Sequence, residues 1–102
     1  MPASSGLVTG RVRVILDLAD IASIQPGEIL VTAYTDTGWS YVFGILGGLI
    51  TETGGVLCHA SIVARECGIP ALVCVQEASK RFKTGMLVTL DAEKGKIHLH
   101  ED

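Results

Sequence analysis

The alternation of apolar and polar positions along the chain predicts several short strands. Residues 11–16 alternate between arginine and valine before Ile-Leu, which is typical of a strand with one face in water. Residues 28–33 are mostly apolar and follow a Pro-Gly turn signal, as expected of a strand buried on both faces. Similar short apolar runs predict further strands at residues 49–51, 71–75, 87–90 and 96–99.

The clearest helical pattern covers residues 59–67. Apolar residues recur there at spacings of three and four, which places them on one face of a helix. The positions of that face are Ala60, Val63, Ala64 and Cys67. We expect Gly68 to end the helix as a left-handed C-terminal cap, and Pro70 prevents the helix from restarting.

Two weaker helical patterns lie on either side. Asp36 or Thr37 is expected to cap a short helix that runs through Phe43 and ends near the glycine pair Gly47 and Gly48, with its aromatic residues in packing roles. Residues 76–83 are expected to form a small surface helix, and residues 2–6 a loose start to the chain.

The order of these elements predicts the fold class. Residues 49–75 read as strand, glycine loop, helix and strand, a unit that joins parallel strands through a right-handed crossover. With about six short strands and two or three helices, residues 1–102 are expected to form one α/β domain of mixed sheets. The strand order does not follow from one sequence.

The composition of the chain argues against nucleic acid and membranes as its partners. A net charge of -3 and an isoelectric point near 5.5 offer no basic surface for nucleic acid. The longest uncharged stretch, residues 37–51, falls short of the roughly 20 apolar residues that span a bilayer, and no secretory signal is visible. The three cysteines lack CxxC spacing, which favours free thiols over structural zinc. We expect a soluble, cytoplasmic domain without membrane or nucleic-acid contacts.

The strongest chemical feature is a glycine pair, Gly54 and Gly55, that leads within four residues to His59 at the start of a helix. Glycines let backbone N–H groups surround an anion, and a helix N-terminus favours negative charge by roughly 0.3–1 kcal/mol. Neutral imidazole offers one ring nitrogen as a nucleophile. The alternative is a surface or capping histidine. Cys58 suits a capping or packing role better than a Cys-His dyad, because adjacent residues entering a helix diverge by roughly 100°.

Residues 52–73 resemble the signature of the mobile phosphohistidine domain of phosphoenolpyruvate (PEP)-utilising enzymes. This family includes PEP synthase, pyruvate phosphate dikinase and rifampicin phosphotransferase. The resemblance extends to flanking segments at residues 6–10, 26–31 and 85–99, and thus covers nearly the whole chain. It implies a swivelling β/β/α three-layer domain that shuttles phosphate between two distant sites, with His59 as the phosphorylated histidine.

The resemblance also implies partners and cofactors. ATP and Mg²⁺ are expected on an ATP-grasp nucleotide-binding domain, and PEP, pyruvate or another acceptor on a further domain, in the same chain or in separate subunits. This chain itself is expected to bind no cofactor and no metal. Many relatives have threonine where this chain has Leu57. The apolar residue at this position favours the rifampicin phosphotransferase type within the family, and Glu52 before the glycines favours the same type.

Several other residues are weaker candidates. Thr53 precedes the glycine pair. Arg65 is expected either to touch phosphate in a docked state or, more in keeping with helix-surface arginines, to pair with Glu66 or Asp36 in a solvated network. His98 and His100 share one face of a strand, where a solvated strand end is favoured over a metal site. A second hypothesis for the whole chain is a non-catalytic anion-binding or regulatory module with the same fold.

Overall fold

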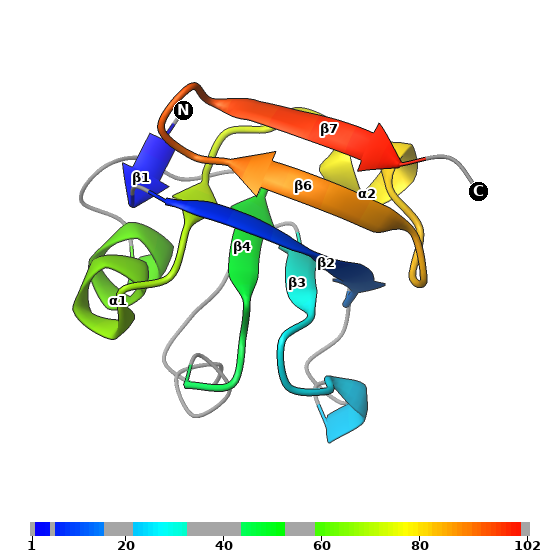
Figure 1. Cartoon of the computed structure of the whole chain (residues 1–102), viewed down its shortest axis with the longest axis horizontal. Coiled ribbons are helices and arrows are strands. Elements are labelled where there is room, and N and C mark those ends of the chain that lie inside the picture. Colours follow the sequence, from blue (N-terminus) through cyan, green and yellow to red (C-terminus); the bar gives the residue numbers. More distant parts are fainter. Residues whose placement is uncertain (1, 5, 16–21, 33–43, 53–58, 101–102) are drawn as a thin grey trace.

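A mixed sheet of seven strands, which curls at strand β2, organises the described part of the chain (Figure 1). The computed structural model describes residues 2–4, 6–15, 22–32, 44–52 and 59–100, with the backbone alone for residues 2–4 and 59–61. The strands are β1 (Pro2–Ser4), β2 (Leu7–Val14), β3 (Ile29–Thr32), β4 (Gly48–Thr51), β5 (Ala71–Leu72), β6 (Leu87–Asp91) and β7 (Lys96–His100). The helices are α1 (His59–Cys67) and α2 (Ala78–Arg81).

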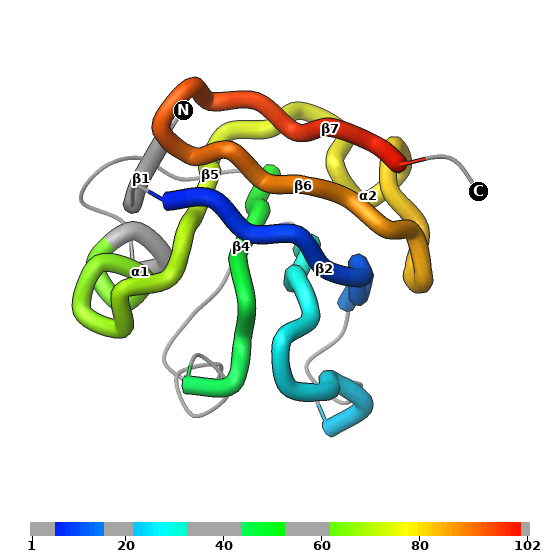
Figure 2. The backbone as a smooth tube through the Cα atoms, in the orientation of Figure 1, coloured from blue at the N-terminus to red at the C-terminus, as the bar shows by residue number. Residues whose placement is uncertain are grey.

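Strand β2 belongs to two parts of the sheet at once. The order is β1-β5-β4-β3-β2-β6-β7, in which β5, β4, β3 and β2 run parallel while β1, β6 and β7 are antiparallel to their neighbours. Residues 7–11 of β2 pair with β6, whereas residues 12–14 pair with β3. The β6–β7 hairpin therefore folds over the parallel strands, and the tube of β2 crosses that of β4 in Figure 2.

A glycine at the start of β4 permits this close approach of the two β layers. A Cβ atom on Gly48 would lie 2.9 Å from Leu90 Cδ2 and 3.1 Å from Val8 Cγ1, both side chains of the overlying layer. Contacts this short require the neighbouring side chains to move. The bend in β2 is similarly tight, because a Cβ atom on Gly10 would lie 2.8 Å from the Gly27 carbonyl oxygen.

Two apolar cores on opposite faces of the parallel strands define three layers. One core holds Leu30 and Leu49 together with Ala64 of α1, and the other holds Ile29 and Ile50 together with residues of β6. Neighbouring residues of β3 and β4 thus point into different cores, so these strands have no polar face. The layers are the β6–β7 hairpin, the parallel strands and α1, which confirms the expected α/β fold with a β/β/α arrangement.

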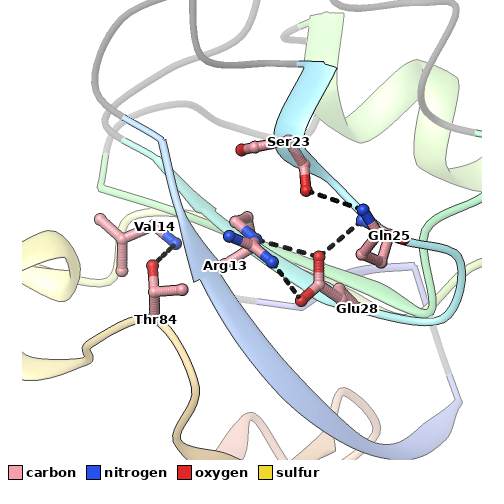
Figure 3. Close-up of polar contacts among 6 residues, drawn as sticks. All are labelled: Arg13, Val14, Ser23, Gln25, Glu28 and Thr84. Carbon is pink, nitrogen blue, oxygen red and sulfur yellow. Dashed lines mark hydrogen bonds and ion pairs between the residues drawn. The ribbon is translucent and has the colours of Figure 1, made fainter.

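An ion pair secures the turn that leads into β3 (Figure 3). Arg13 donates from Nε and Nη2 to the two carboxylate oxygens of Glu28, both at 3.0 Å. The Gln25 backbone N–H donates to Glu28 Oε1 at 2.6 Å, so one carboxylate holds both the turn and strand β2. Planar two-point contacts of this kind fix geometry better than a single surface ion pair does.

Helix α1 and the parallel β4–α1–β5 connection agree with the sequence pattern, whereas several strand limits differ. Residues 2–4 are not a loose start but form β1, a three-residue edge strand paired with β5. Strand β2 begins at Leu7, before the predicted strand. The extended run after residue 71 stops early, because Cys74 has a φ of 59°. Residues 36–43 of the predicted helix before β4 lie outside the described residues, and its predicted end near Gly47 and Gly48 was wrong, because residues 44–45 form a turn and Gly48 begins β4.

Candidate functional site

The carboxyl ends of the parallel strands meet at one edge of the sheet. Thr32 ends β3 beside Thr51 at the end of β4, and both are buried. The backbone N–H of Glu52 donates to the Thr32 carbonyl at 3.0 Å, and that of Val75 donates to the Thr51 carbonyl at 2.9 Å. In open α/β sheets ligands bind outside this edge, so the loops that leave it are the natural place for a site.

His59 is the first residue of α1, the helix that follows β4 in the chain. No acidic residue occupies the first turn of α1, so no carboxylate of that turn competes with an anion for the helix N-terminus. Four predicted site residues precede it, and all lie outside the described residues: Thr53, Gly54, Gly55 and Cys58. The described residues on either side of them are Glu52, directly after β4, and His59, which begins α1.

The C-terminal end of α1 is closed by the expected glycine cap. Gly68 has a φ of 71°, and its N–H donates to the Arg65 carbonyl at 3.3 Å. The Ile69 N–H donates to the Ala64 carbonyl at 3.1 Å, which completes the two hydrogen bonds of a Schellman motif. Ile69 also packs against the core that contains Ala64, so the cap ties the helix to the sheet.

One face of α1 packs on the sheet and another is open to solvent. Ala64 is fully buried and Val63 packs against the same core, as predicted. Cys67, at the end of the same predicted face, is exposed, and Ile69 packs against the core beyond the helix end. Ile62 is 41% exposed at a position three residues after His59, which places an apolar side chain on the same side of the helix as the histidine position.

Arg65 is exposed in the last turn of α1, where a positive charge suits the helix C-terminus. A contact with phosphate in a docked state stays a prediction. Of its two suggested ion-pair partners, Glu66 is exposed on the same helix and Asp36 lies outside the described residues.

A hydrogen bond at Glu52, directly after β4, is not visible in the sequence pattern. Ser79 Oγ of α2 donates to Glu52 Oε1 at 2.6 Å, in a partly buried position. This bond connects the residue that opens the loop to a helix on the far side of β5 in the sequence. A glutamate directly after a buried strand is the one local signal of such an anchor, because it brings a charge to the edge of a core.

The histidines of β7 lie away from α1, on an exposed strand face. His100 Nε2 is 2.6 Å from Thr89 Oγ1 of β6, and His98 is exposed beside it. Among the described residues no group of three His, Cys, Asp or Glu side chains is placed to hold a metal ion. Neither Cys67 nor Cys74 forms a disulfide within the described part of the chain. No helix within the described ranges has the length and apolarity to cross a membrane.

Solved structures share this fold. The chain superposes on Enzyme I with a TM-score of 0.69 at 22% identity, covering 81% of this chain and 34% of that one. At this level of identity the likeness concerns the fold alone. The chain is thus a small β/β/α domain in which a histidine begins helix α1.

The family follows from the sequence match. Residues 24–95 match the model of the PEP-utilising enzyme, mobile domain, and the chain belongs to this family. It is similar to rifampicin phosphotransferase of Bacillus cereus, with 46% identity over 99 residues, and to phosphoenolpyruvate synthase of Aeropyrum pernix, with 42% identity over 99 residues. These matches cover 97% and 96% of this chain but only 11% and 12% of the relatives, which therefore contain large regions without a counterpart here.

Proposed function

We propose that this chain is a phosphohistidine carrier domain of a phosphotransferase. In this proposal His59 takes a phosphoryl group from ATP bound on an ATP-grasp domain. It then passes the group to an acceptor on a further domain, which is either pyruvate, giving PEP, or another small molecule. The observation that carries the proposal is the position of His59 at the first residue of α1, directly after the loop from β4, in a chain of the mobile-domain family. The lack of a disulfide at Cys67 and Cys74, together with ATP-dependent chemistry, suits the cytoplasm.

The proposed transfer is a nucleophilic displacement in two halves. A neutral imidazole nitrogen of His59 attacks phosphorus of the donor, the bond from phosphorus to the leaving oxygen breaks, and the ring loses its N–H proton. In the second half an acceptor oxygen attacks the same phosphorus, the phosphorus–nitrogen bond breaks, and the ring regains a proton. The backbone N–H groups at the start of α1 would favour the negative charge of the bound phosphoryl group.

The architecture suits a domain that moves as a unit. Two apolar cores join α1, the parallel strands and the β6–β7 hairpin, and the Schellman cap holds the far end of α1 to one of them. A carrier needs this stiffness, because the histidine must arrive at each site in a defined orientation. ATP and Mg²⁺ would be held by partner domains, and the carrier would supply only the nucleophile and its surroundings. Gly54, Gly55, Cys58 and Thr53 are proposed as the loop that lines the phosphoryl group.

A labelling experiment tests this proposal. The chain is incubated with a cognate ATP-binding domain and ATP labelled in the transferable phosphoryl groups. We expect a label that is stable in alkali, is lost in acid and is absent from His59→Ala. A label that survives in His59→Ala would refute the assignment.

The second hypothesis, a non-catalytic anion-binding module, makes a different prediction for His59→Asn. A binding module would keep its anion affinity and its contribution to the complete system in this variant. A carrier would lose all phosphoryl transfer while the domain still docks, because asparagine keeps the polar volume but has no nucleophilic ring nitrogen.

A further inference from the structure

A groove of about 510 Å³ lies at the end of the molecule farthest from α1. It is formed where the segment between α2 and β6 meets the end of β7, on the right of Figure 1, whereas α1 is on the left. Cross-strand pairing places Arg11, Leu87 and His100 in one row across β2, β6 and β7 at this end. The groove is thus a second surface, separate from the helix that begins with His59.

The rim of the groove is positively charged. Arg11 Nη1 donates to the Gly85 carbonyl at 3.0 Å, which holds the guanidinium along the rim. Lys83 is exposed, and its ammonium has no ion pair within the described part of the chain. None of the described residues that line the groove is acidic. Lys80 and Arg81 precede Lys83 and are also exposed, so four of the eight lysine and arginine residues lie at this end of a chain whose net charge is -3.

The imidazole at the end of β7 is held in place by a row of hydroxyl groups. His100 Nε2 lies 2.6 Å from Thr89 Oγ1, which lies 2.8 Å from Thr9 Oγ1. The ring therefore presents a fixed edge to the groove. A side chain ordered before binding loses less conformational entropy when a ligand arrives.

The floor of the groove is apolar. Leu99 is 49% exposed, one of the few large apolar side chains of the described residues that face water, and Met86 lines the groove with it, whereas Leu87 points to the other face of β6, with Arg11 and His100. Met86 also contacts the core between the two β layers, so the floor is supported from below. A methionine side chain can adapt its shape to different partners. Covering a half-exposed leucine removes apolar surface from water, which favours binding.

We propose that this groove docks an acidic protein segment with an apolar anchor residue, supplied by another domain or subunit of the phosphotransferase. Carboxylates of the segment would pair with Lys83 and Arg11 while its apolar residue covers Leu99. A free phosphate would leave the apolar floor unused, and nucleic acid would find no phenylalanine, tyrosine or tryptophan among the lining residues. Complementary charge would steer the encounter, and the apolar anchor would prolong it.

This docking site deepens the proposed carrier function and rests on it. A carrier leaves one active site before it reaches the other, and a segment bound at the far end would hold it close to the assembly without covering His59. The tether raises the effective concentration of the carrier at both sites.

The test is a titration of the 102-residue chain with a synthetic probe, N-acetyl-Glu-Asp-Leu-Glu-Leu-Asp-amide, followed by amide chemical shifts. We expect shifts at Met86, Leu87 and Leu99, and affinity that falls at least fivefold when the carboxylates become amides or the leucines become serines. K83E should weaken binding at least fivefold, whereas K94E, a control at an exposed lysine outside the groove, should change it less than twofold.

Three results would overturn the docking proposal. They are equal losses in K83E and K94E, shifts that map elsewhere on the domain, and binding of anionic lipid vesicles that depends on Lys83 when the peptide does not bind. Phosphoryl labelling of His59, measured in the same K83E protein, separates this proposal from the carrier function. Intact labelling without peptide binding refutes only the groove, and peptide binding that depends on Lys83 without any labelling refutes only the carrier.

Discussion

Replacing the glycine that closes α1 gives a prediction whose magnitude follows from the backbone. Gly68 has a φ of 71°, and a Cβ atom built there meets no atom within 4 Å. The cost of Gly68→Ala is therefore conformational and contains no steric clash. A left-handed conformation costs a residue with a Cβ atom roughly 1–2 kcal/mol, and the stiffer unfolded chain of the variant offsets about 0.4–1 kcal/mol of this.

The expected net effect is a destabilisation of about 1 kcal/mol, which lowers the melting temperature of a domain of this size by roughly 4–8 °C. Gly68→Asn should lose less, because asparagine tolerates the left-handed region better than alanine does. Gly44→Ala is the matched control. Its Cβ atom also meets nothing within 4 Å, but its φ is not positive, so stability should be unchanged or slightly raised.

Urea unfolding followed by circular dichroism measures all three variants against the native chain. If Gly68→Ala unfolded at the same urea concentration as Gly44→Ala, the Schellman cap would not be the feature that ends α1. An equal loss in the alanine and asparagine variants would likewise contradict the left-handed argument, since it would point to a contact and not to the backbone.

Two further predictions concern the core and the loop stem. Leu49→Ala, at a fully buried position between α1 and the sheet, should cost about 2–5 kcal/mol in urea unfolding, whereas Leu7→Ala, at a residue that is 68% exposed, should cost less than about 0.5 kcal/mol. Ser79→Ala should lose about 1 kcal/mol, because it removes the donor to the carboxylate of Glu52. Glu52→Gln keeps a carbonyl acceptor for the serine and should lose less, and the reverse order of these two variants would argue against that hydrogen bond.

Local patterns predicted the helix that begins with His59 and the strands around it. A nine-residue helix with a glycine cap and a following proline contains its own start and stop signals, so neighbouring elements were not needed to define it. The buried strands β3 and β4 were visible for the same reason, as short apolar runs between turns.

Features that depend on distant partners were not visible in the sequence. Strand β1 has three residues and exists because β5 pairs with it, and the exposed first half of β2 is a strand because β6 lies alongside. The Ser79–Glu52 hydrogen bond joins residues 27 positions apart. Such pairings are set by tertiary contacts, which override local propensity. The groove near Leu99 could not be predicted from the sequence for the same reason, since its residues come from three separate strands and a turn.

The most direct test of the carrier function is to find the atom that binds phosphorus. After incubation of the chain with its cognate ATP-binding domain and ATP, phosphorus and proton NMR spectra report whether phosphorus is bonded to nitrogen and to which ring. We expect a phosphorus–nitrogen bond on the imidazole of His59, which is lost in acid and on addition of the acceptor. Phosphorus bonded to oxygen, to a cysteine thiol or to His98 or His100 would contradict it.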